Sequence, residues 1–283
     1  MPEPVVSIRR LVKSRQGGAG YHLRVDSLLV RPGDRLALVG QSGCGKSTLL
    51  DMLGLVLRPD MRLVPGNSFV WRRGSTGEQV DVMRSWRSGD EGSRERIRRE
   101  DIGYVLQSGG LLPFLTVRDN ITLPARLKGY PRAKELESSL VWLASELGIG
   151  HLLKKYPGTV SMGERQRAAV ARALIHRPAL ILADEPTASL DPPTAARVFD
   201  LLLELSAGMP LVVSTHDEQR VRSLGFTIRR IICQDMGPGG GIKATLRHPD
   251  GRCPQGASGR PPEGGIIEDF GDAGHAAPFP DGR

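Results

Sequence analysis

The sequence predicts an α/β fold: a mixed sheet with flanking helices, an antiparallel β part at the N-terminal end, and an added α-helical subdomain. Two stretches predict the sheet. Residues 34–57 read as a short apolar strand, a glycine-rich turn and a helix with apolar residues at helical spacing. Residues 180–185 form an apolar run that ends in two carboxylates, as expected of a buried strand. The section 108–176 reads as helical, which predicts the subdomain.

The composition limits the classes of protein that fit. A chain of 283 residues can bury a sizeable core and hold one domain with a subdomain. The cysteines Cys44, Cys233 and Cys253 lack the spacing of a metal site, which favours a reducing compartment and no structural metal. The N-terminal residues show no signal-peptide core, and no run of about 18 apolar residues occurs. We therefore expect a cytoplasmic protein that does not itself span a membrane.

The net charge of +8 comes with arginines scattered along the chain. Few aromatic residues lie among them to stack on bases, so we interpret the charge as a solvated basic surface and expect no nucleic acid partner. A nucleotide phosphate is the anion for which the sequence is clearly prepared, as the loop described next indicates.

A phosphate-binding loop follows the strand predicted at 34–39. The pattern Gly-x4-Gly-Lys-Ser lets backbone N–H groups converge on a phosphate chain at the start of a helix. We expect Lys46 to reach the β- and γ-phosphates and Ser47 to ligate Mg²⁺. We also expect the thiol of Cys44 to react with a maleimide, the alternative being a thiol packed inertly beneath the loop. The residues predicted to bind nucleotide here are Gly40, Gln41, Ser42, Gly43, Cys44, Gly45, Lys46, Ser47 and Thr48.

Other elements follow from local patterns. Val5–Leu11 and Tyr21–Val30 alternate as two strands of a hairpin, and Tyr21 is a candidate to stack on adenine, although such an aromatic more often only packs. Residues 58–100 look like an inserted, partly mobile surface lobe with a strand at 68–71 and a short helix at 93–99. Further strands are expected at 102–107, 211–214 and 228–234, and helices at 132–147, at 161–176 and from Asp191.

The end of the chain has a different composition. Residues 237–283 hold 12 glycines and 7 prolines, so 19 of 47 residues are chain-breakers. This fraction exceeds the roughly 25–30% associated with disorder, and we expect a flexible tail after a domain that spans 1–236.

Taken together, these motifs resemble the ATP-binding-cassette (ABC) ATPases over about residues 5–234. The discriminating feature is the helix start Val-Ser-Met-Gly-Glu-Arg-Gln-Arg at 160–167, which is similar to the family signature Leu-Ser-Gly-Gly-Gln-Gln-Gln-Arg. Ser161 and Gly163 are kept. Met162 and Glu164 depart from the signature, and Glu164 also occupies the capping-box position of the helix. The resemblance implies a P-loop NTPase core that binds and hydrolyses ATP with Mg²⁺.

The same resemblance implies a role for each remaining motif. Gln107 would ligate Mg²⁺ and sense the γ-phosphate, and Asp191 would lie in the loop that bridges two subunits. Ser161 and Gly163 would complete the site of a partner, which implies a head-to-tail homodimer with two ATP molecules at its interface. The implied catalytic residues are Lys46, the general base Glu185 and the switch histidine His216, and the implied Mg²⁺ ligands are Ser47, Gln107 and Asp184.

Residues 108–121 are similar to the stretch Leu-Leu-Pro-x-Leu-Thr-Val-x-Asn-Asn of ABC ATPases for lipoprotein release and macrolide export. Leu111, Leu112, Phe114 and Leu115 would be exposed apolar residues without a partner, the alternative being burial in the chain's own core. The resemblance implies a transporter subunit, held at the cytoplasmic face of the inner membrane by a permease. A soluble ABC ATPase acting on DNA or ribosomes is the alternative, although no long coiled-coil insertion and no second cassette is present.

Overall fold

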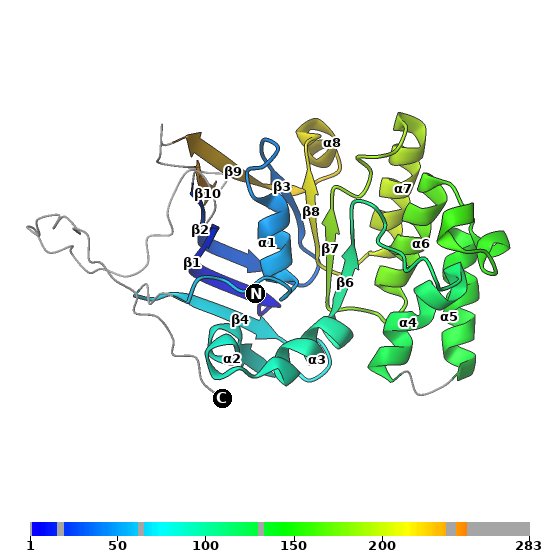
Figure 1. The fold of residues 1–283 in the computed structure, drawn as a ribbon, viewed down its shortest axis with the longest axis horizontal. Coiled ribbons are helices and arrows are strands. Elements are labelled where there is room, and N and C mark those ends of the chain that lie inside the picture. The colour runs from blue at the N-terminus through cyan, green and yellow to red at the C-terminus, as the bar shows by residue number, and fades with distance from the viewer. Residues whose placement is uncertain (1, 16–19, 62–64, 130–132, 236–241, 248–283) are drawn as a thin grey trace, which may run out of the picture. The chain divides into compact units, whose positions relative to one another are not determined.

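A computed structural model describes residues 2–15, 20–61, 65–129, 133–235 and 242–247 (Figure 1). Within these ranges the strands form a ten-stranded sheet in the order β5-β4-β1-β2-β10-β9-β3-β8-β7-β6. The strands are β1 (Val6–Arg15), β2 (Tyr21–Val30), β3 (Arg35–Val39), β4 (Ser68–Arg72), β5 (Gln79–Asp81), β6 (Ile102–Val105), β7 (Leu180–Asp184), β8 (Leu211–Thr215), β9 (Thr227–Asp235) and β10 (Ile242–Arg247). The helices are α1 (Lys46–Leu53), α2 (Val82–Ser88), α3 (Glu91–Asp101), α4 (Val117–Lys128), α5 (Ala133–Glu146), α6 (Met162–Leu174), α7 (Pro192–Leu205) and α8 (Glu218–Ser223), with 3-10 turns η1 (Gly150–Leu152) and η2 (Pro157–Thr159).

The half of the sheet that carries the phosphate loop is parallel. β3 pairs with β8 and β9, β8 pairs with β7, and β7 pairs with β6. Val39 at the end of β3 is opposite Thr215 and Arg230, and Asp184 is opposite Ser214. Because the carboxyl ends of parallel strands meet at one edge of a sheet, the phosphate loop and the two strand-end carboxylates reach the same edge.

The other half of the sheet is mainly antiparallel. β1 and β2 form the predicted hairpin, with Val6 opposite Val30, and β4 and β5 continue the sheet beyond β1.

Side chains of β3, in the parallel half, alternate between the two faces: Ala37 and Val39 belong to one buried apolar cluster, and Leu36 and Leu38 to the other. The parallel strands are therefore buried on both faces, as sheets covered by helices require.

Part of the segment predicted to be a flexible tail, residues 242–247, is a strand. Ile242–Arg247 form β10, which pairs in parallel with β2 and antiparallel with β9 and so joins the two halves of the sheet. Ala244 and Leu246 are buried, whereas Lys243 is exposed. The six-residue strand was missed because glycines and prolines on either side of it dominate the composition. Residues 248–283, with Cys253, lie outside the described residues.

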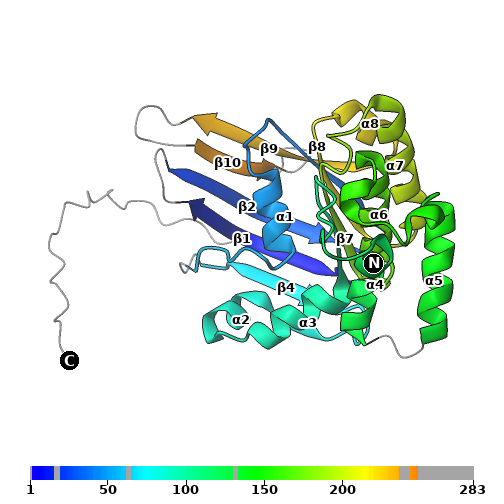
Figure 2. The ribbon, with the colours of Figure 1, turned by 45° about the vertical axis from the view of Figure 1, so that its right-hand side comes forward.

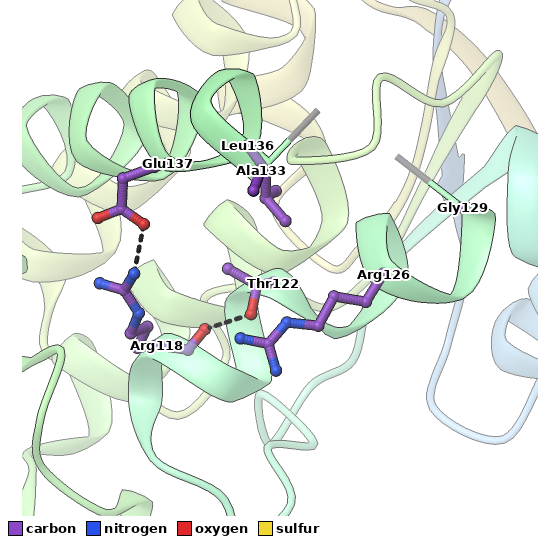
Figure 3. Close-up of a pocket in the computed structure, with 7 residues that line it drawn as sticks. All are labelled: Arg118, Thr122, Arg126, Gly129, Ala133, Leu136 and Glu137. Carbon is purple, nitrogen blue, oxygen red and sulfur yellow. Dashed lines mark hydrogen bonds and ion pairs between the residues drawn. The ribbon is translucent and has the colours of Figure 1, made fainter. Parts of the chain in front are cut away.

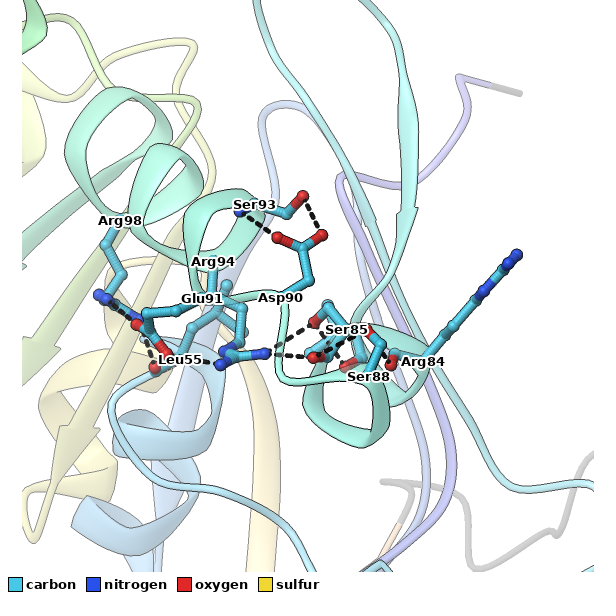
Figure 4. A network of polar contacts seen from close by, with 10 residues as sticks. Leu55, Arg84, Ser85, Ser88, Asp90, Glu91, Ser93, Arg94 and Arg98 are labelled. Atoms are coloured by element: carbon cyan, nitrogen blue, oxygen red, sulfur yellow. Dashed lines mark hydrogen bonds and ion pairs between the residues drawn. The ribbon is translucent and has the colours of Figure 1, made fainter.

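The segment 58–100 is a packed part of the domain rather than a surface lobe, leaving aside residues 62–64, which lie outside the described residues. Trp71 of β4 and Ile97 of α3 are fully buried in the same cluster as α1. Between α2 and α3, the guanidinium of Arg94 lies 3.8 Å from the ring centroid of Trp86. The same guanidinium donates to the carbonyl of Ser85 (Figure 4). α2 and β5 were missed because their few apolar residues stand among arginines and serines.

The helical subdomain lies at the β6 end of the sheet. Figures 1 and 2 show α4, α5, α6 and α7 gathered there, and their apolar faces share one cluster. α6 begins with the predicted capping box: the hydroxyl of Ser161 accepts the N–H of Glu164, and the Glu164 carboxylate accepts the N–H of Ser161. α7 begins after Asp191, whose carboxylate accepts the N–H of Thr194. Both helix starts are where the sequence places them.

Candidate functional site

The phosphate loop, residues 40–48, connects the end of β3 to the start of α1. Gly43 and Gly45 adopt positive φ angles of 75° and 99°, a conformation that favours glycine. A Cβ at Gly40 would lie 2.6 Å from the Sγ of Cys44 and 2.7 Å from the carbonyl oxygen of Ile231, so a side chain does not fit there. No side chain caps α1 at Gly45. The N–H groups of its first turn therefore remain suited to an anion.

A hollow of about 500 Å³ opens at this loop. It brings together predicted site residues from four parts of the chain: the start of β2, the loop, and the segments that follow β6 and β7. The residues that line it are Tyr21, Ser42, Gly43, Gly45, Lys46, Ser47, Thr48, Gln107 and Glu185. Its size and its donors fit a polyphosphate, since backbone N–H groups, hydroxyls and one lysine surround it.

Lys46 is held in place before any anion arrives. Its side chain is only 4% exposed, and Nζ donates to the carbonyl oxygens of Gly40 at 3.1 Å and Gln41 at 3.2 Å. Nζ also lies 3.4 Å from Oε1 of Glu185. The cation thus sits at the loop with a carboxylate as its counterion, and a phosphate chain can take over that role.

Ser214, which the sequence prediction did not single out, holds the Asp184 carboxylate and the backbone of Glu185. The Ser214 hydroxyl donates to Oδ1 of Asp184 at 2.5 Å and accepts the N–H of Glu185 at 2.9 Å. Glu185 has a φ of 42°, a strained value for a residue other than glycine. The signal for Ser214 was its position, one residue before the end of a strand that neighbours β7 in parallel register.

His216 reaches the same carboxylate from the loop after β8. Its Nε2 lies 2.6 Å from Oε1 of Glu185. The structure therefore brings the three predicted catalytic residues, Lys46, Glu185 and His216, to one carboxylate oxygen. Residues 185 and 216 thus lie at the phosphate loop, and their catalytic roles stay a prediction.

The predicted cation ligands have the right chemistry. Ser47 supplies a hydroxyl, Gln107 an amide oxygen and Asp184 a carboxylate, and hard divalent cations such as Mg²⁺ prefer oxygen ligands. Ser47 and Gln107 line the hollow, and Asp184 precedes Glu185, which also lines it. Among the described residues, no group of three or more His, Cys, Asp or Glu side chains forms a separate metal site.

The side chain of Tyr21 packs against the phosphate loop. Its hydroxyl donates to the carbonyl oxygen of Cys44 at 3.1 Å, and a Cβ at Gly45 would lie 1.7 Å from that hydroxyl oxygen. The packing role is therefore real, while stacking of the Tyr21 ring on adenine stays a prediction. Cys44 is 1% exposed, which favours the packed alternative; the reaction of its thiol with a maleimide stays a prediction.

A second contact holds the other end of α1. The hydroxyl of Tyr104, on β6, donates to Oδ1 of Asp51 at 3.0 Å. Burial, aided by the nearby carboxylates of Asp51 and Asp184, raises the pKa of Tyr104 well above its ordinary value, so this hydroxyl stays protonated as a donor.

The signature residues lie elsewhere. The described residues that line the hollow do not include Ser161, Gly163 or Asp191. A Cβ at Gly163 would lie 2.7 Å from Cγ2 of Thr194, so Gly163 packs against the start of α7, three residues after Asp191. The Ser161 hydroxyl donates to the Glu164 carboxylate at 2.9 Å, and hydrogen bonds from Ser161 hold the pKa of Glu164 below its usual range.

Another hollow, of about 410 Å³, lies between α4 and α5 (Figure 3). Arg118 and Arg126 face it, but Arg118 pairs with Glu137 and Arg126 lies 3.3 Å from Asp119. Its guanidinium groups are thus already paired, and the nucleotide hollow is the better anion site.

A glycine loop between a buried strand and a helix, with a lysine, a hydroxyl and strand-end carboxylates around it, defines a P-loop nucleotide hydrolase. Residues 23–188 match the family model described as ABC transporter. The chain belongs to this ABC transporter family, as its ATP-binding and ATP-hydrolysing component.

Individual relatives agree. A lipoprotein-releasing system ATP-binding protein LolD of Legionella pneumophila (strain Paris) is 37% identical over 223 residues, which cover 77% of this chain and 91% of the relative. The protein of the same system named LolD 2 in Caulobacter vibrioides is 38% identical over 226 residues, covering 78% and 92%. Both relatives are therefore covered almost from end to end.

Solved structures show the same architecture. The dimeric post-hydrolysis structure of the ATP-binding cassette MJ0796 with ADP and Pi has a TM-score of 0.66 at 27% identity, covering 84% of this chain and 96% of that chain. The cbiO1 structure from Clostridium perfringens, with a TM-score of 0.63 at 22% identity, supports the fold alone; it covers 85% of this chain and 87% of that one. These findings confirm the predicted fold class and ATPase activity. They favour the transporter over a soluble ATPase for DNA or ribosomes.

Proposed function

We propose that this ATPase subunit works as a head-to-tail homodimer that couples ATP binding and hydrolysis to a separate membrane-spanning permease. The observation that carries the proposal is the separation of the predicted site residues within one chain. Lys46 and Glu185 meet at the phosphate-loop hollow. Ser161 begins α6, and among the described residues none from this helix lines that hollow. A second copy can supply it, and the dimeric relative supports this arrangement.

Each residue at the hollow has a proposed task. Lys46 and the loop N–H groups hold the β- and γ-phosphates, Glu185 orients the attacking water as general base, and His216 hydrogen-bonds the γ-phosphate. Ser47, Gln107 and Asp184 would hold Mg²⁺, which neutralises charge on the phosphate oxygens when it is bound with ATP. Fixed dipoles and charges of this kind suit phosphoryl transfer, because little covalent chemistry falls to the protein.

From the partner copy, Ser161 and the backbone at Gly163 would hold the γ-phosphate, with the loop at Asp191 between the two subunits. The helix start at Ser161 offers N–H groups and a positive dipole end to an anion. Glu164 places a carboxylate beside Ser161, and His151 lies 3.7 Å from it as a partial counterion. The Glu164 charge therefore weakens this half-site relative to a signature with glutamine.

An exposed apolar surface between β6 and α4 supports docking on the permease. Phe114 is 71% exposed, and a groove of about 340 Å³ is lined in part by Leu106, Leu123 and Leu127. Leu111 packs against the core, which agrees with the alternative of burial for that part of the run. Such docking would hold the subunit at the cytoplasmic face of the inner membrane. The names of the relatives point to lipoprotein release as the process served.

Mixing two inactive variants tests the composite site. Lys46→Ala should lose nucleotide binding, and Ser161→Ala should keep binding by the monomer but lose hydrolysis. A head-to-tail dimer of one copy of each has one site with both residues intact. We expect hydrolysis to reappear on mixing and to peak near equal amounts. Absence of hydrolysis at every ratio, with each variant still folded by circular dichroism, would remove the support for a site shared between subunits.

A further inference from the structure

Two cysteines from distant parts of the chain meet beneath the phosphate loop. Cys44 lies in the loop and Cys233 on β9, and both belong to the apolar face that packs α1. The Sγ of Cys44 lies 2.6 Å from the position of a Cβ at Gly40, a position that is also 2.7 Å from the carbonyl oxygen of Ile231. The Cys44 thiol therefore points toward β9.

Cys233 follows Ile231 by two residues along β9, so the two side chains share one face of the sheet. Ile231 and Cys44 are buried members of the cluster against which Cys233 packs. The Cys44 thiol is close enough to interact with the Cys233 thiol, and both are free thiols in the structure. Two reduced sulfur atoms thus lie side by side at the base of the nucleotide site.

The two thiols differ in access. Cys44 is 1% exposed, whereas Cys233 is partly exposed. Burial, and then the neighbouring Cys44 thiol, raises the pKa of Cys233. Because the thiolate is the reactive form, Cys233 reacts slowly at neutral pH and faster as the pH rises toward that raised pKa.

We propose that Cys233 and Cys44 are a site of oxidative modification, in which a low-molecular-weight disulfide converts them into an intramolecular disulfide that ties the phosphate loop to β9. In the first step the Cys233 thiolate attacks the small disulfide, forms a mixed disulfide and releases one small thiol. In the second step the Cys44 thiolate attacks the Cys233 sulfur and releases the other. Two cysteine thiols are oxidised by two electrons, one small disulfide is reduced, and the two protons end on the released thiols.

The bond would disturb the nucleotide site. A disulfide brings its sulfur atoms to about 2.05 Å, closer than two unbonded thiols approach. Cys44 stands between Gly43 and Gly45, whose positive φ angles set the direction of the loop N–H groups. Moving Cys44 toward β9 therefore moves the phosphate-binding backbone. A displacement near 1 Å at such a site lowers kcat/KM by about 10²-fold.

The experiment uses the full-length Cys253→Ser protein, so that only this pair of thiols remains. The protein is incubated with oxidised glutathione at pH 7 and at pH 9, then assayed for ATP hydrolysis and mapped by mass spectrometry. We expect a Cys44–Cys233 linked peptide that forms faster at pH 9, a loss of kcat/KM of about 10²-fold, and recovery with dithiothreitol. The variants Cys233→Ser and Cys233→Val, made in the same Cys253→Ser protein, should keep their activity after the same treatment.

The inference fails if no linked peptide forms while glutathione adds to Cys233, or if the linked protein hydrolyses ATP at the untreated rate. It also fails if oxidised glutathione lowers the activity of both Cys233 variants as much as that of the Cys253→Ser protein. In that case modification of Cys44 alone would account for the loss. The proposed transport role is a separate matter, because the linked peptide is detected whether or not a permease binds. Absence of hydrolysis before treatment would instead count against the ATPase assignment.

Discussion

Nε2 of His216 lies 2.6 Å from Oε1 of Glu185, the same oxygen that lies 3.4 Å from Nζ of Lys46. The Glu185 carboxylate thus contacts both Lys46 and His216, the two side chains that the proposed mechanism assigns to the phosphates. A γ-phosphate in the hollow would compete with Glu185 for both groups. In that case the carboxylate becomes available to orient water only when the nucleotide has taken its partners, which links activation of the base to substrate binding.

Glu185→Gln should keep ATP binding and lower turnover by about 10²–10⁴-fold, the usual effect of removing a positioned general base. The neutral amide also removes the carboxylate that holds Lys46 and His216, so ATP should bind at least as tightly. We further expect the variant to accumulate as a dimer with Mg-ATP on size-exclusion chromatography. Glu204→Gln, an exposed glutamate on α7, is the matched control. A monomeric and fully active Glu185→Gln protein would contradict the role of this residue.

Ser214→Ala should raise the Mg²⁺ concentration needed for half-maximal hydrolysis. The hydroxyl donates to the Asp184 carboxylate and accepts the backbone N–H of Glu185, so its loss leaves the Asp184 carboxylate less firmly oriented. Loss of a residue that orients a metal ligand typically costs 10–100-fold in metal affinity. Ser206→Ala removes another buried serine far from the hollow and controls for general loss of stability. Unchanged Mg²⁺ dependence in Ser214→Ala would show that Asp184 needs no such support.

Much of this site could be predicted from the sequence because its parts are local. The phosphate loop is a continuous run from Gly40 to Thr48, and the carboxylates follow directly after an apolar strand. The rule that parallel strands end at one edge then suffices to bring Gln107, Glu185 and His216 near the loop.

The rest depends on contacts that no local pattern records. Ser214 is one of several serines, and its register opposite Asp184 distinguishes it. The approach of Cys44 to Cys233 depends on where β9 runs beside the loop. β10 was missed for a related reason, since its six residues gain their stability by pairing with β2 and β9 on both sides.

His176→Gln should flatten the loss of stability in mild acid. Burial, opposed by a hydrogen bond to the carbonyl of Ile102, lowers the pKa of His176 from 6.5 to about 4. Between these values the unfolded chain binds a proton that the folded chain does not. The contribution of His176 to the free energy of unfolding is therefore fully present above pH 6.5. It is lost as the pH drops toward 4, by up to about 3 kcal/mol.

The test compares urea unfolding of the two proteins from pH 7.5 to pH 4. We expect the unfolding free energy of His176→Gln to change less across this range, whatever its value at pH 7.5. The glutamine amide can still donate to the Ile102 carbonyl, which keeps the comparison fair. His151→Gln alters an exposed histidine and should retain the full acid dependence. Equal slopes for His176→Gln and the unaltered protein would mean that His176 is not buried as a neutral imidazole.

Phe114→Ala should uncouple the subunit from its permease while leaving its own ATPase activity intact. The side chain is 71% exposed and lies in the segment between β6 and α4, and it does not line the nucleotide hollow. An exposed aromatic of this size is typical of an anchor at a protein interface, where truncation costs 2 kcal/mol or more, about 30-fold in affinity. The measurements are co-purification with the proposed permease and the stimulation of ATPase activity by that permease.

Trp142→Ala supplies the matched control, because Trp142 is also a large exposed aromatic, 54% exposed, but stands on α5. We expect Phe114→Ala to lose co-purification and stimulation, and Trp142→Ala to keep both. Equal loss in the two variants would indicate a general effect of removing surface aromatics. Full retention by Phe114→Ala would mean that the permease docks elsewhere, because its binding would then not depend on the exposed Phe114 side chain.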